Sequence, residues 1–172
     1  MLRINHAICF IALLAGVCTQ ANAAEASNWQ VTQGMDKLSQ KSMCLLESTS
    51  QSVNDGRTTT PMQIVYNGKA FLVLTRSKID LTYPGLGLHV DGKPVHAIDR
   101  IYKGTHVVFE STAENMRMQF IKGKTAYIVL GFWPTWPKSH TIVTRFSLIG
   151  FHAAYRKYLA CLKTHPAANI QQ

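Results

Sequence analysis

The chain has 172 residues and carries 18 lysines and arginines against 9 acidic residues, a formal net charge of +9. A positively charged protein favours anionic partners, namely membrane headgroups, acidic glycans or acidic proteins. A net charge well away from zero also keeps a protein soluble, whatever its partners. The basic residues are scattered and no nucleic-acid-binding motif is present, which argues against a DNA- or RNA-binding protein.

The first 23 residues are predicted to be a secretory signal peptide. Arg3 precedes an apolar run from Ala7 to Cys18, and Ala21-Asn22-Ala23 provides an A-x-A cleavage site. The apolar run is shorter than the roughly 20 residues that a membrane-spanning helix needs. We therefore expect export to the periplasm or the exterior, and one domain formed by residues 24–172.

A lipoprotein anchored through Cys18 is the alternative form of export. It is disfavoured because Val17, the residue just before this cysteine, is larger than the small residue that lipoprotein processing prefers.

Two cysteines, Cys44 and Cys161, remain after the signal peptide is removed. Exported chains with two thiols most often pair them, so we predict a Cys44–Cys161 disulfide that ties the first strand region to the C-terminal segment. A free nucleophilic thiol is the alternative, but nothing around either cysteine indicates a lowered thiol pKa.

Two β-hairpins are predicted from turn dipeptides between alternating apolar residues. Residues 61–76, "PMQIVYNGKAFLVLTR", turn at Asn67-Gly68, which favours a type I′ turn and would pair Ile64 with Phe71. Residues 86–97, "LGLHVDGKPVHA", turn at Asp91-Gly92 in the same way. Leu88 would then face Val95, and His89 and His96 would lie together on the opposite face.

A third hairpin is predicted over residues 116–131, "MRMQFIKGKTAYIVLG", with its turn at Lys122-Gly123 and with Met116, Met118 and Phe120 along one face. Residues 141–149, "TIVTRFSLI", alternate as a further strand. Short, regularly spaced strands of this kind indicate a mainly β protein with an antiparallel sandwich or barrel-like fold.

The C-terminal segment changes from a period of two to a helical period. Its apolar residues recur at i, i+3, i+4, i+7, i+8 and i+11 from Phe151 to Leu162, with Arg156 and Lys157 on the polar side. We expect one amphipathic helix over about residues 150–163, packed across the sheets and held by Cys161.

Five segments, taken in order, resemble the invasion-associated locus B proteins. They are "NWQV" (28–31), "CLLES" (44–48), "YPGLGLHVDGKPV" (83–95), "FIKGKTAYIVL" (120–130) and "FSLIGFHAAYRKYLAC" (146–161). The resemblance implies an exported β-sandwich protein of the cell envelope, without enzymatic activity and linked in some bacteria to invasion of host cells. The chain departs from that family in lacking its additional cysteines, since Thr32 and "STAENMRM" stand where they often occur. An invasion role does not follow from a shared fold.

No catalytic set is recognisable in the sequence. There is no G-x-S-x-G motif, and "KGKT" at 122–125 lacks the upstream glycine of a phosphate-binding loop. Asp55, Asp91 and Asp99 fall in predicted turns and do not form a carboxylate pair across a cleft. We therefore expect no enzymatic activity and no cofactor; a small hydrolase without a recognisable motif is the alternative.

Metal binding is a second alternative. His89 and His96 on one hairpin face, joined by His106, could bind zinc or copper, and the thioethers of Met116 and Met118 would suit Cu(I). Against this, alternating methionines usually fill core gaps and a metal site needs three or four converging ligands.

"WPTWPK", residues 133–138, is the preferred contact surface. Prolines stiffen this connection and tryptophan is enriched at binding hot spots, so we predict that Trp133, Trp136, Lys138 and Arg145 contact a protein or an anionic envelope component, with peripheral membrane contact included. In the alternative arrangement Trp133 closes the sandwich end over the helix and only Trp136 is partly exposed.

Overall fold

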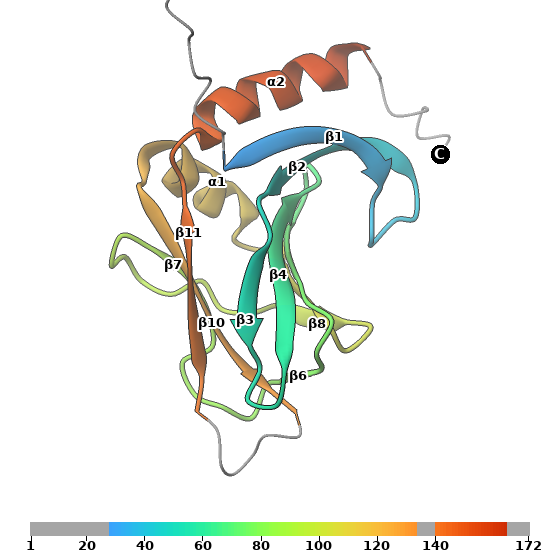
Figure 1. The fold of residues 1–172 in the computed structure, drawn as a ribbon. Helices are drawn as coiled ribbons and strands as arrows, with labels where there is room; N and C mark the ends of the chain where they lie inside the picture. Colours follow the sequence, from blue (N-terminus) through green and yellow to red (C-terminus); the bar gives the residue numbers. More distant parts are fainter. Residues whose placement is uncertain (1–27, 134–139, 165–172) are drawn as a thin grey trace, which may run out of the picture.

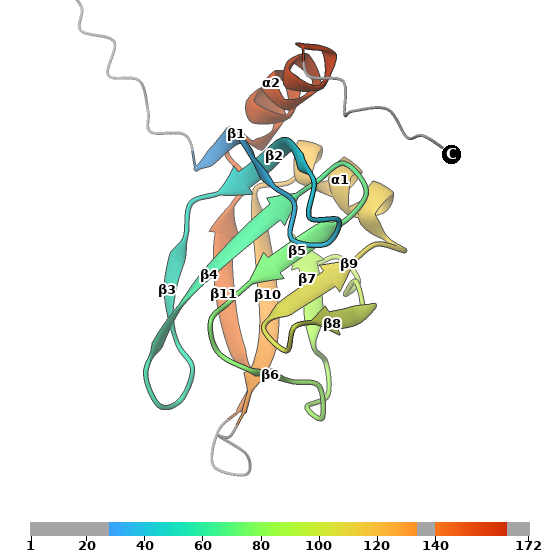
Figure 2. The same ribbon diagram turned by 90° about the vertical axis from the view of Figure 1, so that its right-hand side faces the viewer.

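The computed structural model of the protein describes residues 28–133 and 140–164. Two antiparallel sheets face each other, and helix α2 lies across one end of them (Figures 1 and 2). The elements are β1 (Trp29–Met35), β2 (Ser42–Ser48), β3 (Gln51–Asn54), β4 (Thr59–Tyr66), β5 (Phe71–Leu74), β6 (Ile79–Asp80), β7 (Gly87–Val90), β8 (Arg100–Tyr102), β9 (His106–Phe109), α1 (Ala113–Lys122), β10 (Thr125–Phe132), β11 (Ile142–Ser147) and α2 (Phe151–Thr164). The predicted signal peptide and lipoprotein cysteine lie outside the described residues.

The two sheets differ in size. The larger has the strand order β1-β2-β4-β5-β9-β8, with β3 also paired to β4, and the smaller has the order β11-β10-β6, with β7 also paired to β10. The predicted mainly β, antiparallel sandwich is confirmed. Within the described residues the two sheets do not close into a barrel.

The core lies between the inner faces of the two sheets. Ile64 and Val107 from the larger sheet and Leu88 and Ile128 from the smaller sheet are fully buried in one apolar cluster. Each of these four residues has a more exposed neighbour along its strand, because successive side chains of a strand point to opposite faces of the sheet.

Helix α2 closes one end of the sandwich with aromatic side chains. Trp29 is only 2% exposed and its ring packs edge-on against Phe151 and Phe120, with centroids 4.9 and 5.9 Å away. Its Nε1–H donates to the carbonyl of Ser147 at 2.8 Å, so the start of β1 is tied to the end of β11. The predicted helix is confirmed, and Arg156 and Lys157 lie on its exposed side.

The predicted disulfide is also confirmed. Cys44 of β2 and Cys161 of α2 are bonded, with their Cα atoms 6.1 Å apart and the two residues 117 positions apart in the chain. The bond therefore fastens the closing helix to the larger sheet.

The third predicted hairpin is wrong, because residues 113–122 form helix α1. Met116 and Phe120 are both fully buried, four residues apart on one helical face, whereas Met118 is 40% exposed. The run "AENMRMQFIK" is rich in residues with high helix propensity. The described residues thus contain two helices where one was expected, and Met116 and Met118 do not share a face.

The first hairpin exists, but its turn is longer than predicted. Tyr66 pairs with Phe71 and Ile64 with Val73, so four residues form the turn and the register shifts by two. The cause is the Asn67 side chain, whose Oδ1 accepts the backbone N–H groups of Lys69 and Ala70. A shift of two leaves every side chain on its expected face.

The second hairpin turns at Asp91-Gly92 as predicted, since both residues have positive φ and the Lys93 N–H donates to the Val90 carbonyl at 2.9 Å. Beyond this turn, however, Leu88 lies opposite His96. One extra residue on the second strand, a bulge beside Pro94, produces this register.

The predicted partner of Leu88 is therefore wrong. Val95 is 50% exposed, and His96 shares the buried face of Leu88 and is only 5% exposed. His89 is on the opposite face of the strand, so the two histidines do not lie together.

The turn between β1 and β2 folds over the outer face of the larger sheet, where Leu38 and Met43 cover the buried Leu72. The buried Asp36 carboxylate holds this turn by accepting the Ser39 N–H at 2.7 Å and the Asn67 Nδ2–H at 2.9 Å. Burial opposes ionisation of Asp36, but these hydrogen bonds outweigh it and the pKa lies below its ordinary value. Neither α1 nor α2 is long and apolar enough to cross a bilayer.

Replacing both disulfide cysteines, in Cys44→Ser/Cys161→Ser, should lower the free energy of unfolding by about 2–5 kcal/mol, because the unfolded chain regains a long loop. Urea denaturation of the oxidised wild type and the double variant measures the difference. An equal stability of the two proteins would show that the bond does not hold α2 in place.

The stability should depend on pH through Asp36. A lowered pKa in the folded state means that the carboxylate stabilises the fold above about pH 4, and that this contribution disappears as the pH falls through the folded-state value. We expect Asp36→Asn to be less stable than wild type at neutral pH, and the gap to narrow in acid. Urea denaturation over a pH series tests this; a gap that stays constant would contradict it.

Candidate functional site

The candidate site lies at the end of the sandwich away from α2, where β10 finishes at Phe132 and the chain continues with Trp133 (Figure 1). We call this region, formed by Asp55, Arg57, Ser77, Lys78 and Trp133, the distal end. The Trp133 side chain is 57% exposed. The alternative in which Trp133 closes the sandwich over the helix is therefore wrong.

Strand β6 positions Trp133 by joining the two sheets. Ile79 pairs with Phe132 of the smaller sheet, and the Trp133 N–H donates to the Lys78 carbonyl at 2.9 Å. From the same strand, the Ile79 N–H donates to the Gly104 carbonyl in the β8–β9 turn of the larger sheet, also at 2.9 Å. Lys78 and Trp133, 55 positions apart in the printed sequence, are thereby held side by side.

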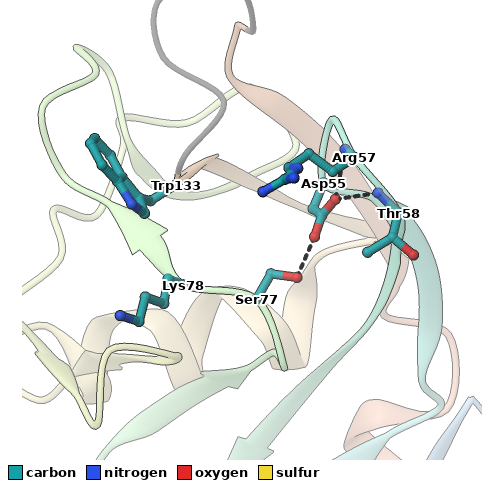
Figure 3. Close-up of a pocket in the computed structure, with 6 residues that line it drawn as sticks. All are labelled: Asp55, Arg57, Thr58, Ser77, Lys78 and Trp133. Atoms are coloured by element: carbon teal, nitrogen blue, oxygen red, sulfur yellow. Dashed lines mark hydrogen bonds between the residues drawn. The ribbon is translucent and has the colours of Figure 1, made fainter.

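Asp55 stabilises the turn between β3 and β4, which lies across a hollow from Trp133 (Figure 3). Its carboxylate accepts the Ser77 hydroxyl and the backbone N–H groups of Arg57 and Thr58, the latter two at 2.9 and 2.8 Å. Burial opposes ionisation of the carboxyl, but the hydrogen bonds outweigh it and lower the pKa of Asp55. The turn that carries Arg57 is therefore fixed to the segment that carries Lys78.

Two open hollows meet at Trp133. One has a volume of about 470 Å³ and the other about 450 Å³. The first is lined by Asp55, Arg57, Thr58, Ser77, Lys78 and Trp133, and the second by Lys78, Ile79, Asp80, Leu81, Ile101, Gly104 and Trp133. Lys78 and Trp133 line both, so the two hollows adjoin at these residues and together extend from the β3–β4 turn to the β8–β9 turn.

The charge that the two hollows present to solvent is positive. Arg57 and Lys78 are exposed, and neither has an ion-pair partner among the described residues. In Figure 3 the Arg57 guanidinium extends across the first hollow toward the Trp133 side. The acids of the two hollows, Asp55 and Asp80, are buried and already accept hydrogen bonds from the protein.

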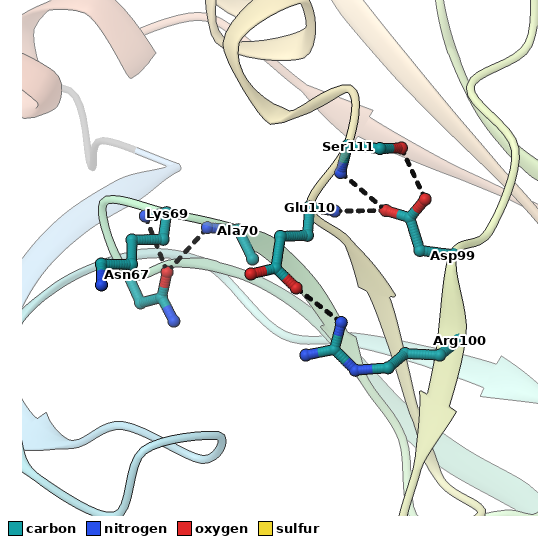
Figure 4. Close-up of polar contacts among 7 residues, drawn as sticks. All are labelled: Asn67, Lys69, Ala70, Asp99, Arg100, Glu110 and Ser111. Carbon is teal, nitrogen blue, oxygen red and sulfur yellow. Dashed lines mark hydrogen bonds and ion pairs between the residues drawn. The ribbon is translucent and has the colours of Figure 1, made fainter.

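Two other arginines of the described residues do have an ion-pair partner. Arg100 pairs with Glu110 at 2.6 Å, next to the Asp99 carboxylate that accepts the Glu110 and Ser111 N–H groups (Figure 4). Arg117 of α1 pairs with the glutamate three residues before it. Arg57 and Lys78, by contrast, have no ion-pair partner among the described residues, so their charges are available to a ligand.

The other residues of the predicted contact surface are not all found here. Trp136 and Lys138 lie outside the described residues. Arg145 lies toward the α2 end of β11, where it is paired with Tyr127 and stacks over its ring at 5.7 Å. Trp133, the residue after β10, is six positions beyond Tyr127, roughly 20 Å along an extended chain. The structure therefore does not bring Arg145 to Trp133.

The histidines of the metal alternative are also apart. His89 stacks on Tyr127 at 4.9 Å on the outer face of the smaller sheet, whereas His96 faces the core. His106 belongs to β9 of the larger sheet and hydrogen-bonds Thr105 at 2.8 Å. Within residues 28–133 and 140–164, no three His, Cys, Asp or Glu side chains lie close enough to hold a metal ion.

Sequence reasoning missed Arg57, Ser77 and Lys78. The run Asn54-Asp55-Gly56 marks a turn, because Asn and Asp bind backbone amides and Gly accepts positive φ. That signal indicates a loop, but only the pairing of β6 with β10 places this loop opposite Trp133.

Comparison of the chain with protein-family models, with curated proteins and with solved structures finds no match. The resemblance to the invasion-associated locus B proteins stays a prediction, and the site is interpreted from its own geometry.

Trp133→Ala should change the free energy of unfolding by no more than about 0.5 kcal/mol, because the indole is mostly exposed. Trp29→Ala, the matched control, should lose about 3–5 kcal/mol because its ring fills the core. Urea denaturation measures both. Comparable losses in the two variants would mean that Trp133 has a structural role.

Proposed function

We propose that this protein is an exported, non-catalytic binding protein of the cell envelope, and that it contacts an anionic partner through the distal end. The observation that carries the proposal is the exposed Trp133 indole at the junction of two hollows, beside the unpaired Arg57 and Lys78. The signal peptide and the basic composition predicted from the sequence support the same compartment and class of partner.

The geometry supports binding because the backbone that carries the contact groups is held in advance. Trp133 is fixed through its backbone to β6, and Arg57 is fixed through the Asp55 turn. A surface that is already ordered loses little conformational entropy when it engages a partner. Tryptophan and arginine are also the residues most enriched among those whose loss weakens binding.

The same contacts argue against a hydrolase at this site. Ser77 is the hydroxyl nearest to a carboxylate, and it donates to Asp55. The lowered pKa of Asp55 makes that carboxylate a weak base, unsuited to take a proton from serine near neutral pH. No histidine is present among the described residues that line the two hollows.

Binding to isolated bacterial envelopes should depend on the distal end. We expect Trp133→Ala and Arg57→Glu/Lys78→Glu each to reduce co-sedimentation affinity about tenfold or more. The first variant removes an exposed aromatic contact, and the second replaces two positive charges that attract the anionic partner with negative ones. Added salt should weaken wild-type binding in the same assay.

Two matched controls come from the other end of the molecule. Ile149→Ala removes an apolar side chain that is 68% exposed, and Arg156→Glu/Lys157→Glu reverses two exposed cations on α2. Both should bind as wild type does. If the control variants lose as much affinity as the distal-end variants, the protein binds by overall charge and the proposal fails.

A further inference from the structure

We infer that the anionic partner is a linear polysaccharide whose sugar rings carry carboxylates, and that it lies along both hollows with one ring against the Trp133 indole. This inference rests on the proposed function, since it names the class of partner for the same surface.

The shape of the surface favours an extended ligand. The two adjoining hollows together extend from the β3–β4 turn, past Trp133 and Lys78, to the β8–β9 turn near Gly104. A compact molecule would occupy one hollow and leave the other to solvent. A linear polymer can occupy both at once, and each occupied hollow adds to its affinity.

The chemistry at the junction favours a sugar. Sugar rings have one face of C–H groups that packs on an aromatic ring, and hydroxyl groups around the edge that need hydrogen-bond partners. The exposed Trp133 indole supplies the aromatic surface. Thr58 and Ser77 also line the first hollow, and the apolar Leu81, 49% exposed, lines the second. A mixture of apolar surface and a few fixed polar groups is typical of small-molecule sites.

The charges favour a carboxylate on that sugar. The Arg57 guanidinium is exposed, unpaired among the described residues and directed across the first hollow (Figure 3). Its planar fork matches a carboxylate with two parallel hydrogen bonds. Lys78, which lines both hollows, can meet a second carboxylate as a point charge. Asp55 and Asp80 also line the hollows, but both are buried and their carboxylates already accept hydrogen bonds from the protein.

Isothermal titration calorimetry of the mature protein with oligogalacturonates of increasing length tests the inference. We expect affinity to rise with length until the oligomer spans both hollows and then to level off, and to weaken with salt. Uncharged malto-oligosaccharides of the same lengths should bind at least about tenfold more weakly, because they form no charge-assisted bonds with Arg57 and Lys78.

Conservative variants separate the two cations. Arg57→Lys keeps the charge but removes the fork, so it should weaken oligogalacturonate binding several-fold more than Lys78→Arg does. Trp133→Ala should abolish detectable binding, and Ile149→Ala should leave it unchanged. Equal effects of the two cation variants would overturn the assigned role of Arg57.

Two further probes distinguish failure of this inference from failure of the proposed function. If vesicles containing phosphatidylglycerol bind in a Trp133-dependent way and oligogalacturonates do not, the inference is overturned in favour of a lipid surface while the proposed function stands. If neither probe binds but the protein still binds envelopes in a Trp133-dependent way, the inference is likewise overturned while the proposed function stands. If envelope binding does not depend on the distal end, both are overturned.

Discussion

The aspartate carboxylate that accepts backbone N–H groups is the interaction on which this structure depends. Asp36 holds the β1–β2 turn, Asp55 the β3–β4 turn, and Asp99 the start of the segment before α1. Asp91 reaches from its own hairpin to the Lys124 N–H at the start of β10. A desolvated carboxylate is stable only when such bonds replace its water, which is why the pKa values of Asp36 and Asp55 are lowered in spite of burial. Asp99 is exposed; its partial desolvation opposes ionisation, and its hydrogen bonds lower its pKa as well.

This use of the acids also determines the charge of the surface. The chain has 9 acidic residues, and the five aspartates accept hydrogen bonds from the protein's own turns. Glu110 and Glu114 pair with the arginines nearest to them. The other lysines and arginines of the described residues have no ion-pair partner, and among them Arg57 and Lys78 flank the exposed Trp133 ring. The bonds that stabilise the turns thus leave a basic contact surface.

The two ends of the sandwich show how one residue type serves opposite purposes. Trp29 is buried beneath α2, packed by Phe120 and Phe151 and hydrogen-bonded to Ser147, and the disulfide fastens the same helix. Trp133 is anchored through its backbone to β6, and its side chain is 57% exposed. Stability is concentrated at the α2 end, so the distal end can present side chains for contact without weakening the fold.

The sequence by itself determined the antiparallel sandwich, the amphipathic α2 and the Cys44–Cys161 bond, because these follow from local periodicity, turn dipeptides and compartment. It did not determine α1: Met116 and Phe120 satisfy a period of two as well as a helical period, and only packing against the core selects the helix. The register at His96 depended on a bulge beside Pro94, which the Asp91-Gly92 turn signal alone does not predict. The candidate site required tertiary structure most of all, since Arg57, Lys78 and Trp133 come from three distant segments and become neighbours only when β6 pairs with β10 and the Asp55 turn closes on Ser77.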